Sequence, residues 1–353
     1  MMVRRRAPAL LIVFALILWG CGGGGGERGS STNVLTTKLV KFVGFDASRE
    51  LVEALGDGRV QGLVLQNPYQ MGQMGIRTLV SHLQKEKVEA KISTGEALAT
   101  PENRDDPAIA KLLNPPRVTG QGGGGPVAKA KSKKWRVIVI PKGTTHEFWQ
   151  TLHAGADQAA LELGNVEVHF QGPEKESDRN RQIELVQTAI GAGYDGIVLA
   201  PLDSEALVGP VEDAVEKGIG VVIIDSALSS KKPASFVATD NYRGGVMGAR
   251  RLGELLGGQG KIILLRYAVG SASTEERENG FLDTMEKEYP KISYLSNDQY
   301  AGATADTAQE KSQNLVARYR GQVDGIFCPN ESSAFGMLRA LEAAGMVKAR
   351  TKP

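Results

Sequence analysis

The sequence predicts an α/β protein with mainly parallel sheets. Short apolar, β-branched runs alternate with helical patterns along most of the chain, and these runs are hydrophobic throughout rather than at every second residue. Strands that are apolar on both faces are typical of parallel sheets covered by helices on each side. Glycines follow many of the helical patterns, where they supply the left-handed residue that ends a helix. With 353 residues, of which 41% are hydrophobic, the chain is long enough for two domains with real cores.

The predicted elements fall into two blocks. Before residue 114 the apolar runs predict strands at 42–45 and 62–65, and the helical patterns predict helices at 49–55 and 71–85. After residue 134, strands are predicted at 136–140, 166–170, 196–200, 221–224, 261–265, 292–296 and 325–328. Helices are predicted between most of them, at 147–163, 181–192, 204–217, 242–256, 274–289, 304–319 and 332–344. Residues 118–134, rich in glycine and lysine, predict a solvated linker between the blocks.

The first twenty residues predict an export signal. The apolar run from Ala7 to Trp19 follows MMVRRR and reaches about 20 Å as a helix, which is short of a membrane span. The segment LWGC, ending at Cys21, is similar to a bacterial lipobox, although Trp19 replaces a small residue. We therefore expect lipidation of Cys21, with residues 21–38 as a flexible tether, and a lipid-anchored protein of the periplasm or cell surface. An ordinary signal peptide, with Cys21 incidental, is the alternative.

Charge and motif content exclude several function classes. The net charge is +2, and removal of the signal with its three arginines leaves a chain close to neutral, so nothing indicates a nucleic-acid partner. Two cysteines, Cys21 and Cys328, exclude a disulfide scaffold and any CxxC site. Four histidines lack metal-ligand spacing, and GxSxG, HExxH and GxxxxGK[ST] motifs are absent. We therefore expect a binding protein rather than an enzyme, without metal or cofactor.

Several segments together resemble the ribose-type periplasmic sugar-binding proteins. The segment VIVIPKGTTHEFWQTLHAGA (137–156) resembles their opening strand, loop and helix. The later segments GIVLAPLDSEAL, GVVIIDSAL, VATDNYRGG, GSASTEERENGF and DGIFCPNESSAFGMLRALEAAG resemble successive pieces of the same family. The resemblance implies the type I periplasmic binding protein fold, which LacI-type repressors share: two Rossmann-like lobes with parallel sheets, joined by a hinge around a ligand cleft.

The order of the segments departs from that family. FVGFDASRELVEAL and GLVLQNPYQMGQMGIRTL resemble its final third, yet they stand ahead of the rest. The sequence therefore resembles a circular permutant, in which residues 39–117 are the family's C-terminal part and residues 118–134 join the original ends. The mapping assigns residues 135–240, with 67–92, to a first lobe. Residues 241–353, with 39–66 and 93–113, form the second.

Candidate ligand contacts follow the predicted strands, because parallel sheets bind ligands at the carboxyl ends of their strands. In the first lobe the resemblance points to Lys142, His146, Phe148, Trp149, Asp225 and Ser226. Phe148 and Trp149 are candidates for stacking on a sugar, and this interpretation is favoured, more for Trp149, over the alternative that they are the buried start of an amphipathic helix. Adjacent residues cannot share one helix face, so at least one of them should point elsewhere. The Asp225 carboxylate can accept two sugar hydroxyls, although aspartate at a strand end also caps helices. For His146, the alternative to a ligand contact is an ordinary histidine of the loop. Ser226 stands at the position where ribose-binding proteins have arginine.

In the second lobe and its crossover, the resemblance points to Phe45, Asp46, Gln66, Arg277, Tyr300 and Asn330. For Asn330, the alternative to a ligand contact is a role as a helix cap. Arg277 is a candidate guanidinium donor to the ligand. The alignment with the family is loose here, so Glu275 or Glu276 could take the same position, and Arg277 could instead be a charge on the helix surface. Tyr300 is the weaker aromatic candidate.

The resemblance implies an exported, monomeric protein that captures a monosaccharide and delivers it to the permease of an ABC transporter. Three alternatives remain open: a sugar-sensing module for a receptor, the effector domain of a LacI-type repressor, and a glycoside hydrolase. The export signal and the lack of a helix-turn-helix segment argue against the repressor.

Overall fold

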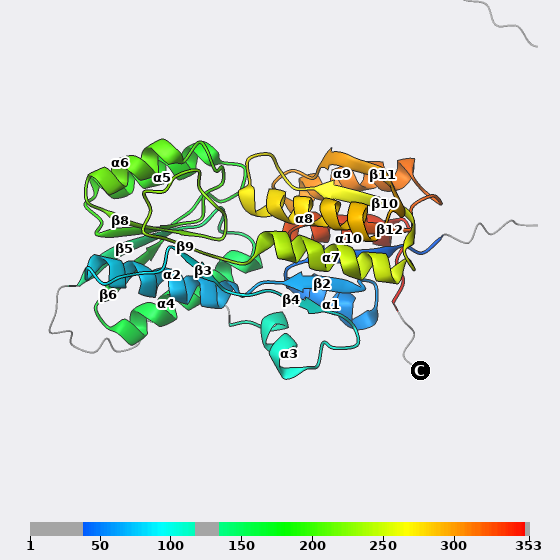
Figure 1. Ribbon diagram of the computed structural model, residues 1–353, viewed down its shortest axis with the longest axis horizontal. Helices are drawn as coiled ribbons and strands as arrows, with labels where there is room; N and C mark the ends of the chain where they lie inside the picture. Colours follow the sequence, from blue (N-terminus) through cyan, green and yellow to red (C-terminus); the bar gives the residue numbers. More distant parts are fainter. Residues whose placement is uncertain (1–37, 117–133, 350–353) are drawn as a thin grey trace, which may run out of the picture. The chain divides into compact units, whose positions relative to one another are not determined.

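The computed structural model describes residues 38–116 and 134–349, which form two six-stranded sheets flanked by helices (Figure 1). The predictions for the signal, Cys21, the tether and the linker lie outside these residues, apart from Lys38 and Lys134. Within the described ranges, no helix combines the length and the apolar character needed to cross a membrane.

The first sheet has the strand order β3-β9-β8-β7-β5-β6, and every neighbouring pair is parallel. Its strands are β3 (Lys91–Ser93), β5 (Trp135–Ile140), β6 (Val166–Phe170), β7 (Gly196–Leu199), β8 (Gly220–Ile224) and β9 (Ser235–Ala238). Helices α2 (Pro68–Leu83) and α4 (Glu147–Leu163) cover one face, and α5 (Arg179–Gly191) and α6 (Val208–Glu216) cover the other (Figure 1). We call this part the first lobe.

The second sheet has the order β11-β10-β12-β1-β2-β4, parallel except for the antiparallel pair of β2 and β4. Its strands are β1 (Lys41–Phe45), β2 (Gly62–Leu65), β4 (Ala97–Ala99), β10 (Gln259–Arg266), β11 (Lys291–Tyr300) and β12 (Gly325–Phe327). Helices α7 (Asn241–Leu255) and α8 (Ala272–Glu288) pack on one face, and α1 (Arg49–Asp57), α9 (Ala305–Arg318) and α10 (Glu331–Ala343) on the other. The short helix α3 (Pro107–Leu113) follows β4. We call this part the second lobe.

The strands are apolar throughout because each sheet has a core on both faces. In β5, Val137 and Val139 pack with α2 and α4, whereas Ile138 and Ile140 pack on the opposite side with α5. Successive side chains of a strand point to opposite faces, so a sheet between two helix layers needs an apolar residue at every position. This is the pattern from which the sequence predicted parallel sheets.

Three described segments connect the lobes, and they run from β2 to α2, from β3 to β4 and from β9 to α7. Helix α2 therefore packs in the first lobe although the strand before it belongs to the second. Its start at Pro68, three residues before the predicted position, is fixed by Asn67, whose side chain accepts the amide of Gln70, and by the proline in the first turn.

The predicted boundaries differ from the structure in a few places. The sequence did not predict β3, β4, β9 and α3, because these short elements are not unbroken runs of buried apolar residues, unlike the equally short strands β2 and β12. Helix α6 begins at Val208 rather than at residue 204, because Oδ1 of Asp203 accepts the amides of Glu205 and Ala206 and holds them in a turn. Strand β11 extends to Tyr300, four residues beyond the predicted end.

Candidate functional site

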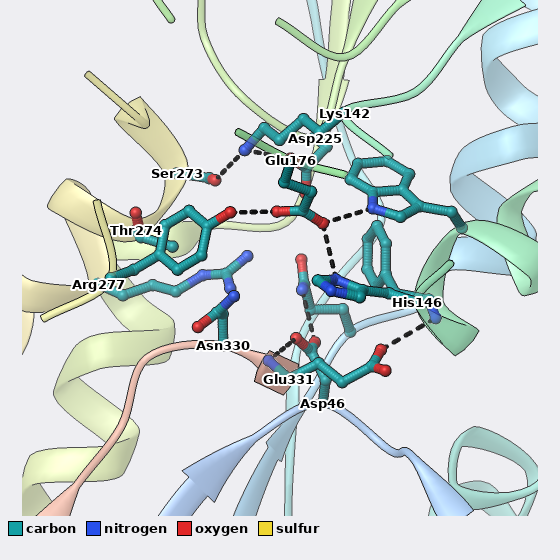
Figure 2. Close-up of a pocket in the computed structure, with 14 residues that line it drawn as sticks. Asp46, Lys142, His146, Glu176, Asp225, Ser273, Thr274, Arg277, Asn330 and Glu331 are labelled. Carbon is teal, nitrogen blue, oxygen red and sulfur yellow. Dashed lines mark hydrogen bonds and ion pairs between the residues drawn. The ribbon is translucent and has the colours of Figure 1, made fainter. Parts of the chain in front are cut away.

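A cavity of about 320 Å³, including its part open to solvent, lies between the two lobes. Most of its lining follows the carboxyl ends of strands, where parallel sheets bind ligands. The lining residues are Asp46, Gln66, Lys142, His146, Phe148, Trp149, Glu176, Asp225, Tyr267, Ser273, Thr274, Arg277, Asn330 and Glu331 (Figure 2).

Two aspartates hold equivalent positions in the two lobes. Asp46 follows β1 and Asp225 follows β8, and both adopt positive φ angles, of 70° and 60°. Lys85 is the one other non-glycine residue with positive φ in the described part of the chain. Side chains with a Cβ rarely adopt this conformation, and local strain of this kind concentrates at functional sites.

Asp225 forms a buried ion pair with Lys142. The carboxylate Oδ2 lies 2.9 Å from Nζ of Lys142, and both side chains are at most 5% exposed. The same ammonium group donates to the hydroxyls of Ser273 and Ser271 in the second lobe, at 3.0 and 3.3 Å. Lys142 therefore contacts both lobes from the wall of the cavity, and Asp225 does not cap a helix.

Two aromatic rings of α4 line the first-lobe side of the cavity. Phe148 and Trp149 meet edge to face, with ring centroids 4.8 Å apart and an angle of 85° between the planes. The helical spacing predicted that at least one of these neighbours points away, yet both line the cavity, because they lie in the first turn of a helix whose N-terminus points at it. Both rings also belong to the core under α2 and α4, and their stacking on a sugar stays a prediction.

Glu176, in the loop after β6, connects the polar groups around these rings. Its Oε1 accepts the indole N–H of Trp149 at 2.6 Å and lies 2.8 Å from Nδ1 of His146. Its second oxygen accepts the hydroxyl of Tyr267 from the second lobe (Figure 2). Burial alone would raise the pKa of Glu176, but His146, Lys142 and Tyr267 outweigh it and hold the pKa at about 2. Burial lowers the pKa of His146, but the Glu176 carboxylate overcomes this effect and raises the pKa to about 9.

Asp46, Gln66 and Glu331 form a carboxylate-rich corner in the second lobe. The two Asp46 oxygens accept the side-chain amide of Gln66 at 2.7 Å and the backbone amide of Glu331 at 3.0 Å. The Glu331 carboxylate accepts the backbone amides of Glu147 and Phe148, at 3.2 and 3.1 Å, and so caps α4 from the other lobe. Helix α4 has no cap of its own, because His146 at its N-cap position makes no side-chain capping bond.

Arg277 and Asn330 complete the second-lobe wall. The guanidinium of Arg277 lies over the ring of Phe45, 4.0 Å from the centroid, and donates to Asn241 and to the carbonyl of Pro329. Asn330 both lines the cavity and caps α10, since its side-chain oxygen accepts the amide of Ser333. The capping role of Asn330 is therefore confirmed, and its contact with a ligand stays a prediction.

Nine of the twelve residues proposed as ligand contacts line the cavity, and three do not. Phe45 is fully buried beneath Arg277, and the hydroxyl of Ser226 accepts the amide of Ser273. Tyr300 is 38% exposed at the end of β11, where its ring lies under Arg266, 5.9 Å away, because the strand extends farther than predicted. The structure therefore places Tyr300 outside the site, and Phe45 and Ser226 behind its wall. Arg277, rather than Glu275 or Glu276, is the residue of its segment that lines the cavity.

Five lining residues were not predicted from the sequence: Glu176, Tyr267, Ser273, Thr274 and Glu331. Tyr267 directly follows β10 and Glu331 directly follows Asn330, so inspection of every strand end would have found them. Glu176 lies six residues beyond β6 in a loop with several charged residues, and no spacing distinguishes it there. Among the described residues, no group of three or more His, Cys, Asp or Glu side chains could hold a metal ion.

Comparison with known proteins gives consistent matches. A family model described as a periplasmic binding protein domain matches residues 137–352. The xylitol-binding protein of Mycolicibacterium smegmatis is 28% identical over 228 residues, which cover 65% of this chain and 63% of that protein. The D-allose-binding periplasmic protein of Escherichia coli is 31% identical over 215 residues, which cover 59% of this chain and 68% of that protein.

Solved structures of solute-binding proteins are also similar to this chain. An ABC transporter solute binding protein from Agrobacterium vitis with bound D-fucose is 36% identical, with a TM-score of 0.57, over 60% of this chain and 73% of that one. The match thus spans less than two thirds of the length of the first relative, 68% of the second and 73% of the solved structure.

Proposed function

The chain belongs to the periplasmic binding protein domain family, and from this premise we propose that it is an extracytoplasmic solute-binding protein that captures a monosaccharide between its lobes. The observation that supports this proposal most directly is the convergence of strand-end polar groups from both sheets on a cavity with two aromatic rings. A sugar presents hydroxyls around its rim and weakly apolar C–H faces, so this combination of groups matches its chemistry. The charged side chains supply the strong hydrogen bonds that orient the rim.

We propose that binding is coupled to closure of the two lobes. Contacts that join them beside the cavity include those of Lys142 with Ser271 and Ser273, of Glu331 with the start of α4, and of Glu176 with Tyr267. A ligand that contacts both walls stabilises the arrangement in which these contacts exist, and so shifts the population toward it. The three segments between the lobes serve as the hinge.

The closed form would present its ligand to the permease of an ABC transporter. The solved relative from Agrobacterium vitis is described as an ABC transporter solute binding protein, which supports this partner. For Cys21 we propose lipidation, which would hold the protein at the membrane close to such a permease. Mass spectrometry of the protein from its native host tests this directly: a diacylglyceryl group on Cys21 supports the anchor, and an unmodified thiol contradicts it.

We also propose that the chain is circularly permuted relative to its family. The family model matches residues 137–352, while residues 38–116 lie outside the match and still supply β1, β2 and β4 to the second sheet. Strand β1 lies between β12 and β2, and the amide of Val40 donates to the carbonyl of Met346 at 2.9 Å. The first described strand therefore begins beside the end of the last described helix, as expected where a continuous chain has been opened.

A thermal-shift screen against pentoses, hexoses, polyols and deoxysugars tests the binding proposal. A ligand present at 100 times its Kd adds about 2.7 kcal/mol to the unfolding free energy, which raises the melting temperature clearly. A cooperative melt that no member of the panel shifts would contradict the proposal.

A further inference from the structure

Most of the charge in the cavity is paired within the protein. The Glu176 carboxylate faces His146 at 2.8 Å, and the Asp225 carboxylate faces Lys142 at 2.9 Å. Each pair joins one negative to one positive group, since the pKa of His146 is about 9. The carboxylates that remain in the lining are Asp46 and Glu331, and Arg277 is the one cation that the lining leaves for both.

Arg277 neutralises that corner only in part. Its guanidinium is 98% buried and directs two of its nitrogens to Asn241 and to the carbonyl of Pro329 rather than to a carboxylate. Asp46 and Glu331 are themselves linked through the backbone amide of Glu331 and lie in the same corner (Figure 2). The corner therefore holds two carboxyl groups against one cation, beside the ring of Phe148.

Gln66 gives a second, independent indication of a ligand at this corner. The residue is 5% exposed and lines the cavity, and its Nε2 donates to Asp46. Its Oε1 is buried without a hydrogen-bond partner. A buried acceptor without a donor costs free energy, so a donor supplied by the ligand at this point stabilises the complex.

Resting on the proposed sugar-binding function, we infer that the ligand carries an ammonium group, as an amino sugar or an amino polyol does, which binds against Asp46, Glu331 and Oε1 of Gln66. An ammonium group has three N–H donors and no acceptor, and this corner offers three acceptor groups. The adjacent ring of Phe148 also favours a cation. A metal ion fits less well, because the described residues contain no cluster of three metal-binding side chains.

The titration of the corner agrees with this inference. Burial raises the pKa of Asp46, despite the nearby Arg277, and raises the pKa of Glu331 to about 7. In both carboxyl groups the effect of burial outweighs that of the nearby cation, which is Arg277 for Asp46 and His146 for Glu331. A bound ammonium would lower both pKa values and would release protons when it binds near neutral pH.

Isothermal titration calorimetry with matched ligands tests the inference. The pairs are D-glucosamine and D-glucose, D-galactosamine and D-galactose, and 1-amino-1-deoxy-D-glucitol and D-glucitol, titrated at pH 6.5 into the full chain. We expect the amino member of at least one pair to bind about tenfold or more tightly than its neutral partner. Glu331→Gln should reduce this ratio, whereas Glu342→Gln, at the exposed end of the same helix, should leave it unchanged.

A second measurement uses the unmodified protein, so it does not depend on the folding of a variant. Between pH 5 and 6.5 the affinity for an amino ligand should rise with pH, because Glu331, whose pKa is about 7, ionises more completely while the amine stays protonated. His146, Arg277 and Asp225 also face this corner, and His146 keeps its charge over this range because its pKa is about 9. Affinity for a neutral sugar should show no such rise.

The outcomes separate this inference from the function on which it rests. Binding of neutral sugars, with amino counterparts equal or weaker, overturns the ammonium inference and leaves the sugar-binding function standing. The absence of binding by both members of every pair, in a protein that melts cooperatively, counts against both proposals.

Discussion

The Nδ1 atom of His146 lies 2.8 Å from Oε1 of Glu176, and the same oxygen accepts the indole N–H of Trp149 at 2.6 Å. One carboxylate thus fixes the orientation of a histidine and an aromatic ring in the first lobe. Through its other oxygen it also contacts Tyr267 in the second lobe.

This pair predicts a bounded pH range of stabilisation. The pKa of Glu176 is held at about 2, against a usual 4.5, so its contribution is present above pH 4.5 and is lost as the pH falls toward 2. The pKa of His146 is raised from 6.5 to about 9, so its contribution is present below pH 6.5 and is lost as the pH rises through 9. The melting-temperature difference between wild type and His146→Asn should be largest between pH 4.5 and 6.5. A difference that is constant from pH 4.5 to 9.5 would contradict this assignment.

Glu176→Gln should weaken ligand binding without changing the size of the side chain. Hydrogen bonds to a charged group contribute about 1.5–3 kcal/mol, so we expect a loss of about 10- to 100-fold in affinity for whichever ligand the screen identifies. Glu174→Gln, an exposed residue of the same loop, is the matched control and should bind as the wild type does. Equal affinities for all three proteins, by calorimetry, would show that Glu176 does not organise the site.

Close packing of α2 against α4 predicts a large loss of stability for Gly155→Ala. A Cβ at Gly155 would lie 2.0 Å from the carbonyl oxygen of Tyr69, a backbone atom that cannot move aside without shifting α2. We expect a loss of about 1–3 kcal/mol in the unfolding free energy, measured by urea denaturation. Gly191→Ala, at the exposed end of α5 with open space around it, should be neutral or stabilise by up to about 1 kcal/mol. The prediction fails if the two substitutions have the same effect.

The contact between Val40 and Met346 predicts that the chain order can be changed without loss of fold or binding. A rearranged gene would begin at Lys134, join Lys348 to Lys38 by a short linker, and end at Arg117. Its melting temperature and ligand affinity should equal those of the present chain, because the packed contacts survive. Loss of the cooperative melt in the rearranged protein would argue against a permuted relationship to the family.

The sequence predicted the regular parts of this fold because both faces of each sheet are buried. A strand such as β8, which is buried at every position, leaves an unbroken apolar run that no loop or surface helix imitates. Asp225 and Asp46 could be found from the sequence because the carboxyl end of a strand is a fixed place, and a polar residue there stands out against the run before it.

The remaining site residues depend on tertiary geometry that no local pattern contains. Glu176 reaches the cavity from within a long loop, and its partners Trp149 and Tyr267 are 27 and 91 residues away in sequence. Tyr300 was misplaced because the length of β11 is set by its pairing with β10, which continues to Arg266, rather than by its own apolar residues. Phe45 was assigned to the ligand, yet it supports Arg277 from behind the cavity wall, which a strand pattern cannot distinguish.

The central claim, that the cavity between the lobes binds a monosaccharide, is tested most directly by calorimetric titration of the purified protein and of Asp225→Asn with the ligands that shift its melting temperature. The account predicts saturable one-site binding to the wild type, weakened about 10- to 100-fold in Asp225→Asn, because a charge-assisted contact to the ligand is lost. Binding that is equally tight in Asp225→Asn, or no binding heat for any sugar of the panel, would contradict it.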